Sequence, residues 1–389
     1  MLQSIIDRLF VTRSLAVRLP GGRELRAGPG EPELTVEVTD PAAVLAISRN
    51  PELALGEAYM DETLLVHGGD IYDLLQLLAS QRARTPPPRH LGLMHTLKRR
   101  AEQANDRRLA RQNVHHHYDL TVDFYRLFLD DDLQYSCAFF EHPDASLGDA
   151  QAAKKRRIID KLLLQPGMSA LDIGCGWGGM GLSLVERGAR VTGVTLSTEQ
   201  QRTARERAAL ARVSDRADFR LEDYRDLNQT FDRIVSVGMF EHVGVPNYQG
   251  YFDTVARLLD EDGVAVIHSI GRRTPPSRTQ PWVRKYIFPG GYIPALSEVM
   301  PAIERSGLWV TDMEILRLHY AETLRHWRQR FLARRDDALE MYDERFCRMW
   351  EFYLAASEVA FREHGHMVFQ LQLARKQTAV PLSRDYLMG

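Results

Sequence analysis

The stretch that most constrains this chain is Ala170-Leu171-Asp172-Ile173-Gly174-Cys175-Gly176-Trp177-Gly178-Gly179. Its apolar residues predict a buried strand, and the glycines that follow predict a tight turn into a helix that ends at Gly188. The helix N-terminus would offer free N–H groups, and the glycines would let a ligand approach the backbone closely. The sequence therefore predicts a cofactor site at this turn.

The glycine spacing matches G-x-G-x-x-G, which alone is a weak signal. A dinucleotide-dependent oxidoreductase would place an acid on the ribose about 20 residues later. The next strand, at 190–197, ends without such an acid, and Asp172 suits an amino-acid group better than a pyrophosphate. These residues favour an S-adenosylmethionine-dependent methyltransferase. A dinucleotide oxidoreductase and a glycine turn without a ligand stay open as alternatives.

Strand and helix patterns alternate from Leu162 onward, which predicts an α/β fold with a doubly wound, Rossmann-like sheet. Ligands of such sheets bind beyond the carboxyl ends of the strands. We expect strands at 169–173, 190–196, 217–221, 231–237, 263–270, 308–316 and 366–374. We expect helices at 178–187, 198–211, 246–260 and 297–306.

Polar residues follow these strands. Asp223 and Tyr224 come after the third, where an adenine would lie. Glu241 lies in the exit loop of the fourth strand, and His268 lies near the end of the fifth. An acid and an imidazole that converge on one cleft favour a catalytic role over a structural pair.

Other segments allow two interpretations. Tyr135 and Ser136 could offer hydroxyls to a ligand or belong to an aromatic core patch. The loop at 272–296 is long enough to predict a functional lid. An aromatic helical insertion at about 320–362 indicates either core packing or a cap over an apolar substrate tunnel.

The chain has 389 residues and a net charge of −2, which predicts a globular, soluble protein of two domains. We expect a small N-terminal α+β domain at 1–82, a basic linker at 83–114 and a catalytic domain at 115–389. The first of these would hold a hairpin at Gly21-Gly22 and a helix capped by Asp40.

The stretch from 82 to 114 carries nine Lys and Arg against only Glu102 and Asp106, a net charge of +7. It could be a solvated linker, or it could be attracted to anionic lipid headgroups. Nucleic acid is not expected as a partner, because aromatic residues do not interleave with the basic ones.

No apolar run reaches the roughly 18 residues of a membrane span, and the N-terminus lacks a signal-peptide layout. Cysteines at 137, 175 and 347 are too far apart for a disulfide framework or a zinc motif, which fits a reducing cytoplasm. The adjacent histidines at 115–117 cannot all face one metal from a regular helix. We therefore expect no metal site.

Taken together, these motifs resemble the cyclopropane-fatty-acyl-phospholipid synthases, whose close relatives are the mycolic acid cyclopropane synthases. The resemblance covers nearly all of the chain and rests on Leu171–Gly179, Gly193–Gln201, Arg233–Gly244 and Tyr286–Pro294. It implies a class I methyltransferase sheet with a helical substrate cap. It also implies that S-adenosylmethionine is held by residues around the strand ends: Tyr135, Ser136, Asp172, Gly174, Cys175, Gly176, Gly179, Thr195, Leu196, Ser197, Gln200, Asp223, Tyr224 and Val237.

The resemblance further implies the reaction. A methylene group passes from S-adenosylmethionine to a cis double bond of an unsaturated phospholipid acyl chain, through methyl transfer, a carbocation and deprotonation assisted by a bicarbonate ion. The family's cage for this bicarbonate matches Cys137, Glu241, His268, Ile270 and Tyr320. A related lipid C-methyltransferase that leaves a methyl branch is the alternative.

The resemblance also suggests a homodimer that acts in the cytoplasm, peripherally associated with the inner face of the membrane. Two departures accompany it. The family usually has Gly-Asn where this chain has Thr121-Val122, which should alter a turn over the cofactor. Many members carry a cysteine where this chain has Ser357, so a catalytic cysteine at that position is excluded here.

Overall fold

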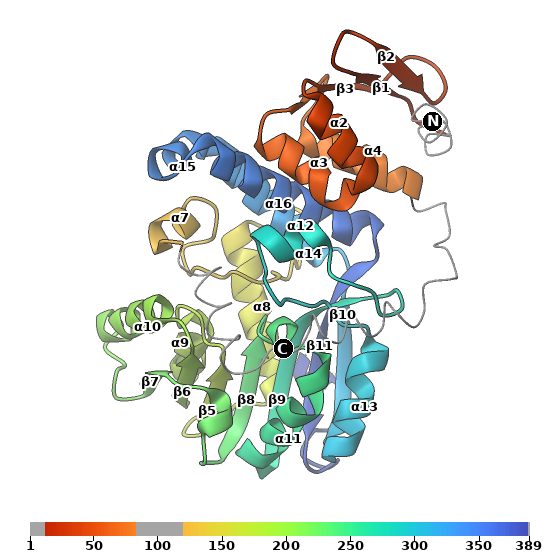
Figure 1. Cartoon of the computed structure of the whole chain (residues 1–389). Helices are drawn as coiled ribbons and strands as arrows, with labels where there is room; N and C mark the ends of the chain where they lie inside the picture. Colours follow the sequence, from red (N-terminus) through yellow and green to blue (C-terminus); the bar gives the residue numbers. More distant parts are fainter. Residues whose placement is uncertain (1–11, 83–119, 388–389) are drawn as a thin grey trace. The chain divides into compact units, whose positions relative to one another are not determined.

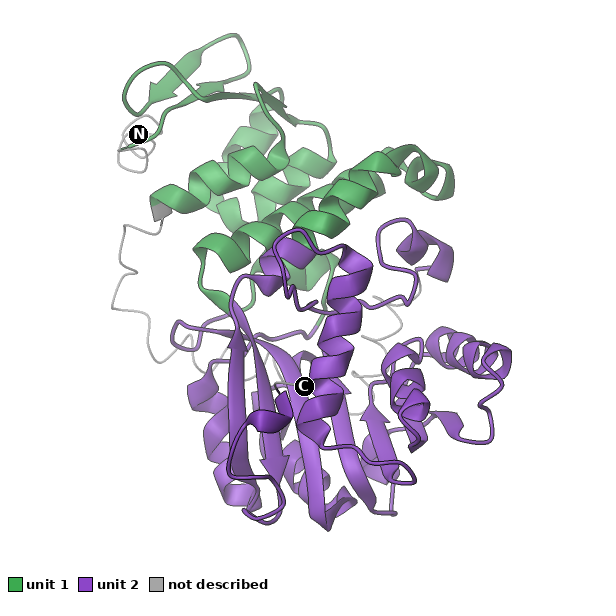
Figure 2. Cartoon of the chain, turned by 180° about the vertical axis from the view of Figure 1, so that it is seen from behind, with its two compact units in different colours: residues 1–93, 279–289, 324–366 green, residues 94–278, 290–323, 367–389 purple. Residues whose placement is uncertain are grey.

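The computed structural model describes residues 12–82 and 120–387 (Figure 1). The expected basic linker at 83–114 and the histidines at 115–117 lie outside these residues. The described residues form two compact units, coloured separately in Figure 2. One contains 12–82, 279–289 and 324–366, and the other contains 120–278, 290–323 and 367–387.

The larger unit is built on a seven-stranded sheet in the order β10-β11-β9-β8-β5-β6-β7. The strands from β7 through β9 pair in parallel, and β10 is antiparallel to β11. Their bounds are β5 Ser169–Ile173, β6 Arg190–Thr195, β7 Ala217–Leu221, β8 Phe231–Val237, β9 Leu259–Arg272, β10 Trp309–Leu316 and β11 His366–Ala374. The predicted doubly wound sheet is confirmed: from β5 the chain adds β6 and β7 on one side and then β8 and β9 on the other, so the strand order switches between β5 and β8.

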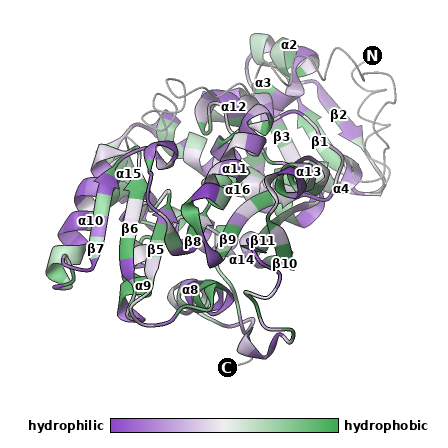
Figure 3. Ribbon diagram, turned by 90° about the horizontal axis from the view of Figure 1, so that it is seen from below, coloured by the Kyte–Doolittle hydropathy of each residue, from purple (hydrophilic) through white to green (hydrophobic). Residues whose placement is uncertain are grey.

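Helices cover both faces of this sheet. Side chains of α8 (Leu147–Leu162), α9 (Gly179–Glu186) and α10 (Thr198–Leu210) share one buried apolar cluster with the strands. Side chains of α11 (Tyr248–Leu258) and α13 (Leu296–Ser306) share the other. In Figure 3, α10 carries largely hydrophilic colours, in keeping with a helix of which few residues are buried. The unit also contains α7 (Val122–Arg126) and short 3₁₀ helices at 224–226, 240–242, 245–247 and 385–387.

The alternation of buried strand residues explains where polar groups end up. On β9, Ala265 and Ile267 join the cluster of α11 and α13, whereas Val266 joins that of α8. His268 therefore faces the α8 side, because side chains of a strand alternate between faces. β11 follows the same rule, with Phe369 and Leu371 in the α11 cluster.

The smaller unit contains a four-stranded sheet in the order β2-β1-β3-β4, where β1 is Leu15–Arg18, β2 Glu24–Ala27, β3 Leu34–Val38 and β4 Leu64–His67. The expected hairpin is the antiparallel β1–β2 pair. Asp40 caps α2, as expected, by accepting a hydrogen bond from the backbone of Ala42. The helices are α2 Pro41–Arg49, α3 Pro51–Met60, α4 Ile71–Arg82, α12 Pro281–Tyr286, α15 Arg335–Met341, α16 Glu344–Glu363 and most of α14, His319–Ala333.

Aromatic packing joins distant segments within this unit. Trp282 of α12 is fully buried, its Nε1–H donates to Met60 Sδ at 3.3 Å, and its ring lies 4.5 Å from that of Phe352 of α16. A side chain at Gly56 of α3 would collide with this ring, because a Cβ there would lie 2.4 Å from Nε1. Part of the expected aromatic insertion thus packs as core, and its use as a substrate tunnel stays a prediction.

Candidate active site

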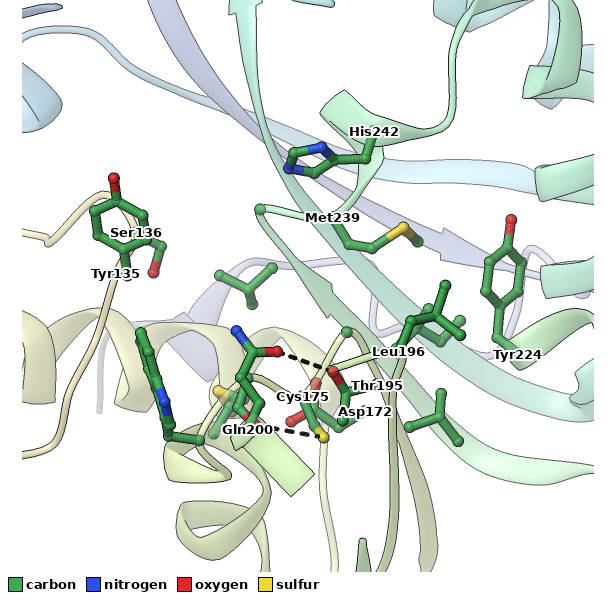
Figure 4. Close-up of a pocket in the computed structure, with 18 of the residues that line it drawn as sticks. Tyr135, Ser136, Asp172, Cys175, Thr195, Leu196, Gln200, Tyr224, Met239 and His242 are labelled. Carbon is green, nitrogen blue, oxygen red and sulfur yellow. Dashed lines mark hydrogen bonds between the residues drawn. The ribbon is translucent and has the colours of Figure 1, made fainter. Parts of the chain in front are cut away.

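A pocket opens at the carboxyl ends of β5, β6, β7 and β8, all within the larger unit (Figure 4). In the close-up, Tyr135 and Ser136 lie on one side and Tyr224 on the other, with Asp172, Thr195 and Gln200 below. Nearly all of the predicted cofactor residues line it: Tyr135, Ser136, Asp172, Gly174, Cys175, Gly176, Gly179, Thr195, Leu196, Gln200, Asp223, Tyr224 and Val237.

The glycine turn after β5 forms the floor of this pocket. Gly174, Gly176 and Gly178 have φ angles of 78°, 53° and 84°, a left-handed conformation that favours glycine. The backbone N–H groups of Gly174 and Cys175 donate to Val194 O at 2.9 and 3.0 Å, so β6 fixes the turn. A Cβ at Gly179 would lie 2.3 Å from Gln134 Nε2, so any side chain there would displace Gln134.

Asp172 offers an unused acceptor in this pocket. Its side chain is 1% exposed, and its Oδ2 has no hydrogen-bond partner among the described residues. Burial raises the pKa of this carboxyl to about 7. A ligand with a donor group, such as an amino group, would satisfy Oδ2 and stabilise its charge. The residues present therefore fit the amino-acid end of S-adenosylmethionine.

The next wall comes from β6 and the start of α10. Thr195 Oγ1 donates to Gln200 Oε1 at 2.9 Å, which leaves the Gln200 amide N–H groups to face other partners. Ser197 does not line the pocket, although it was predicted to bind the cofactor. Its Oγ instead accepts a hydrogen bond from Gln200 N and caps α10. A direct cofactor contact for Ser197 stays a prediction.

Asp223 and Tyr224 end the pocket beyond β7. Arg225 donates hydrogen bonds to both carboxylate oxygens of Asp223, from Nε to Oδ1 at 2.8 Å and from Nη2 to Oδ2 at 2.6 Å. This ion pair orients Asp223 and still leaves lone pairs on its oxygens to accept from an amine. The Tyr224 ring packs edge-on against Tyr251 at 5.7 Å. Arg225 was not predicted as part of the site.

Lys154 of α8 orients side chains on the opposite wall of the pocket. It is fully buried, and its Nζ donates to Gln134 Oε1 at 2.5 Å and to Ser136 Oγ at 2.9 Å. Since Ser136 Oγ accepts this bond, its hydroxyl proton is available to a ligand. Burial lowers the pKa of Lys154 to about 8. The sequence offered a signal that was missed, because Lys154 occupies an inward position of α8 between Ala150 and Ile158.

Of the five predicted catalytic residues, Glu241 and Ile270 are in direct contact. Glu241 Oε1 accepts a hydrogen bond from Ile270 N at 2.6 Å. Its Oε2 is buried and has no partner among the described residues. Burial raises the pKa of Glu241 to about 7. Glu241 itself does not line the pocket, but its neighbours Met239 and His242 do.

His268 lies two residues before Ile270 on β9, and its backbone O accepts from Gly238 N of the pocket at 2.9 Å. Its side chain is 2% exposed, and Nδ1 lies 3.1 Å from Gln370 Nε2. Burial, together with the charges of Lys154 and Lys161, holds the pKa of His268 well below its ordinary range. The imidazole is therefore neutral at physiological pH.

Cys137 and Tyr320 come from two other segments of the same unit. Cys137 is fully buried, and burial raises the pKa of its thiol. The next residue, Ala138, donates its N–H to Thr323 Oγ1 at 3.0 Å, and Thr323 belongs to the helix that begins with His319 and Tyr320. The cage itself, as a set of five converging groups, stays a prediction.

Sequence reasoning also missed His242, Trp177 and Met239, which line the pocket. Burial lowers the pKa of His242 to about 4, so it is neutral. Of the two family departures, Thr121 caps α7 by accepting a hydrogen bond from Phe124 N at 3.3 Å, and Ser357 lies half-buried on α16. Within 12–82 and 120–387, no group of His, Cys, Asp or Glu is arranged to hold a metal, and no helix is long and apolar enough to span a bilayer.

Two known protein families together match most of the chain. The family described as mycolic acid cyclopropane synthetase matches residues 105–371, and a domain of unknown function matches residues 1–85. Tuberculostearic acid methyltransferase UfaA1 of Mycobacterium tuberculosis is 37% identical over 374 residues, which cover 90% of this chain and 85% of that protein. Cyclopropane-fatty-acyl-phospholipid synthase of Escherichia coli K12 is 35% identical over 379 residues, which cover 96% and 97%.

Solved structures agree with the fold. The mycolic acid cyclopropane synthase CmaA1, complexed with S-adenosylhomocysteine and CTAB, has a TM-score of 0.64 and 35% identity, covering 68% of this chain and 97% of that one. Coclaurine N-methyltransferase, bound to N-methylheliamine and S-adenosylhomocysteine, has a TM-score of 0.66 and 20% identity, covering 82% and 98%. At that identity the second likeness concerns the fold alone.

Proposed function

Because this chain belongs to the mycolic acid cyclopropane synthetase family and is an S-adenosylmethionine-dependent methyltransferase, we propose that it makes cyclopropane fatty acyl chains on phospholipids. Its substrate would be a cis double bond of an unsaturated acyl chain at a membrane surface. The same inference places the enzyme in the cytoplasm at the inner face of the membrane, as a homodimer.

The π electrons of the alkene form a new carbon–carbon bond to the methyl group while the methyl–sulfur bond breaks, leaving a carbocation on the second alkene carbon. Loss of a proton from the transferred methyl group frees the electron pair that closes the ring. S-adenosylmethionine supplies the electrophilic methyl, and a bound bicarbonate would supply the base.

The observation that carries this proposal is the unsatisfied carboxyl of Glu241. Its Oε1 is occupied by Ile270 N, and its buried Oε2 has no partner among the described residues, so it fits a ligand with an acidic proton. With a pKa of about 7, the carboxyl can be ionised and accept that proton at neutral pH. A neutral His268 and the hydroxyl of Tyr320 would donate to the oxygens of the same anion.

A second candidate is a lipid C-methyltransferase with a branched product. It is favoured by the 37% identity to a tuberculostearic acid methyltransferase. In that reaction the carbocation would lose a proton from a neighbouring chain carbon, whose C–H electrons form a new double bond, and leave a methyl-branched alkene, which is an isomer of the cyclopropane.

The test is incubation of the protein with methyl-labelled S-adenosylmethionine and vesicles of unsaturated phospholipid, followed by analysis of the acyl chains. Mass spectrometry should find one added carbon and two added hydrogens. NMR then separates ring protons from the vinyl protons of the branched isomer. Label confined to branched chains would select the second candidate, and no label in lipid would contradict both.

Glu241→Gln tests the chemistry of the first candidate. The amide keeps the size of the side chain but presents a donor where the anion's proton must be accepted. Bicarbonate should then bind poorly and the base would be lost, so we expect ring formation to fall by about 10²–10⁴-fold, with branched alkenes and alcohols as by-products. Affinity for S-adenosylhomocysteine should stay near wild type. Cyclopropane at the wild-type rate in bicarbonate-depleted buffer would refute the role of Glu241.

A further inference from the structure

A series of hydrogen-bonded polar side chains ends at His268, one of the predicted catalytic residues. Gln370 Nε2 lies 3.1 Å from His268 Nδ1, and Gln370 Oε1 accepts from Lys161 Nζ at 2.6 Å. Lys161 Nζ also donates to Glu314 Oε2 at 2.5 Å, and Arg157 binds both oxygens of Glu314 at 2.7 and 2.6 Å. Lys161, Gln370 and His268 are buried, so water does not compete for the hydrogen bonds among these three residues.

The fold explains why these residues meet. β11 and β9 are neighbours in the sheet, and Phe369 and Leu371 point to the α11 cluster. Gln370 between them must face α8, as His268 does on β9. Lys161 lies in the last turn of α8, at a buried position of that helix. A glutamine in a sheet interior is costly unless its amide is satisfied on both sides, and here it is.

The direction of each hydrogen bond follows from the donors. A lysine ammonium group can only donate, so the Gln370 group that faces Lys161 must be the carbonyl oxygen. The opposite end of the amide is then the NH₂ group, which can only donate to His268. His268 Nδ1 must therefore be the acceptor nitrogen. A neutral imidazole carries one proton, so that proton lies on Nε2.

We propose that Lys161 and Gln370 are positioning residues that hold His268 as the neutral Nε2–H tautomer. The tautomer itself depends only on the contacts above. Its use, donation from Nε2 to an anion held by Glu241, rests on the proposed function. An imidazole with the proton on Nδ1 would face the Gln370 NH₂ donor to donor, and its Nε2 could not donate to that anion.

The decisive measurement is nitrogen NMR of the full-length protein labelled at the histidine rings, with S-adenosylhomocysteine bound. The chain has 13 histidines, so the His268 signals are assigned by their loss in His268→Gln. We expect a protonated Nε2 and an unprotonated Nδ1, distinguished by their couplings to the ring protons. A protonated Nδ1 in the wild-type protein would overturn the inference, whatever the enzyme makes.

Substitution of Gln370 tests the cause. In Gln370→Glu, a carboxylate can accept from both Lys161 and a protonated Nδ1, so a proton should appear on Nδ1. Gln372→Leu is the matched control, because Gln372 is equally buried on the same face of β11 and donates to Lys161 O at 2.6 Å rather than to His268. This control should keep the wild-type tautomer. If Gln370→Glu left the tautomer unchanged, or Gln372→Leu shifted it, Gln370 would not be its determinant.

Activity provides the functional readout. Gln370→Leu and Gln370→Glu should lower ring formation by about 10- to 100-fold relative to Gln372→Leu, as is usual for residues that orient a metal-binding histidine. Binding of S-adenosylhomocysteine should be equal in all of them. Equal ring formation in the Gln370 variants and in Gln372→Leu would overturn the positioning role. A wild-type enzyme without cyclopropane product would refute the proposed function instead, while the NMR result would still decide the tautomer.

Discussion

Lys154 is a single buried charge that orients the side chains on one wall of the pocket. Its ammonium group is the common donor to Gln134 and Ser136, both of which line the pocket. Lys154→Met would fill a similar volume but leave two acceptors without their charged donor. We expect the dissociation constant of S-adenosylhomocysteine to rise about 10-fold, or about 1.4 kcal/mol, as measured by calorimetry.

Lys155→Met is the control for this prediction. Lys155 is the next residue and forms an ion pair with Asp132 at 2.6 Å, with 15% of its own side chain exposed. Loss of that partly exposed pair should change the affinity for S-adenosylhomocysteine by less than about twofold. If the two variants bound the ligand equally well, Lys154 would be a structural lysine only.

Glu241 should impose a pH dependence on stability. An unperturbed glutamate titrates near 4.5, whereas burial raises the pKa of Glu241 to about 7. Between these values the folded protein keeps a proton that the unfolded chain has lost, so the free energy of unfolding decreases as pH rises. The change should amount to roughly 3 kcal/mol and be complete above pH 7. Glu241→Gln has no such proton, so its unfolding free energy relative to wild type should increase over this window in urea titrations.

Glu314→Gln is a control for which we expect the opposite dependence of the unfolding free energy on pH. Burial alone would raise the pKa of Glu314, but the hydrogen bonds and charges of Arg157 and Lys161 outweigh it and lower the pKa. The stability that Glu314 contributes is therefore present above the unfolded pKa and is lost as pH falls through the folded one. A stability difference for Glu241→Gln that stayed constant from pH 4 to 8 would contradict the raised pKa.

In the glycine turn after β5, an added side chain would have two separate effects: strain on the backbone and loss of space for the ligand. Gly176 has a φ of 53°, and a Cβ there would meet no protein atom within 4 Å, yet Gly176 lines the pocket. Gly176→Ala should destabilise the fold by about 1–2 kcal/mol because of its left-handed backbone. The added methyl group would also project into the ligand's space, so thermal stabilisation by S-adenosylhomocysteine should largely disappear.

Gly167→Ala is a matched control for this turn. Gly167 has a φ of 87°, and its Cβ would likewise meet nothing within 4 Å, but it does not line the pocket. The variant should lose similar stability and keep the full ligand-induced shift, measured by thermal unfolding with and without S-adenosylhomocysteine. Equal shifts for Gly176→Ala and Gly167→Ala would mean that the turn does not contact the ligand.

The elements that could be predicted from sequence are those with a clear period. Strand 169–173 was predictable because a short, mostly apolar run precedes a glycine turn, and strand 217–221 because apolar and polar residues alternate along it. The start of β9 at Leu259 was missed, because Asp260, Glu261 and Asp262 look like a turn. Helix α12 was missed within the expected lid, since prolines and glycines dominate that segment.

The pocket residues divide in the same way. Residues next to the glycine turn, such as Asp172, were predictable because their place follows from local sequence. Lys154 and Gln370 were not predicted, because their roles depend on which strand or loop lies opposite them. The i, i+4 spacing of Lys154 with Ala150 and Ile158 could have placed it on the inward face of α8, but the acceptors that its ammonium group meets depend on tertiary contacts.

The segments that group into each compact unit could not be predicted from their order in the sequence. Residues 279–289 and 324–366 form one compact unit with 12–82, through contacts such as the hydrogen bond of 2.6 Å from Tyr59 Oη to Glu351. Partners separated by almost the entire chain leave no local pattern. The expected domain boundaries, one between residues 82 and 83 and one between residues 114 and 115, stay a prediction.

The basic stretch at 82–114 leads to a prediction for the whole enzyme, since the proposed phospholipid substrate would lie in a membrane. Its net charge of +7 stands in a chain whose overall charge is −2, so electrostatic attraction would be local. Each basic residue near an anionic surface contributes about 1 kcal/mol. Binding to vesicles should therefore strengthen with anionic lipid and weaken with salt, because exposed charges are screened within about 8 Å at physiological ionic strength.

Replacing Lys98, Arg99 and Arg100 together by glutamine tests this charge directly. We expect vesicle binding, measured by sedimentation, to fall by roughly 10²-fold, since three charges correspond to about 3 kcal/mol. Affinity for S-adenosylhomocysteine should not change. The matched control replaces three exposed arginines outside this stretch, Arg187, Arg190 and Arg212, which alters the net charge equally. If both triple variants lost the same affinity, or if neutral and anionic vesicles bound alike at all salt concentrations, the basic stretch would have no specific role, and membrane contact would have to come from other surfaces of the protein.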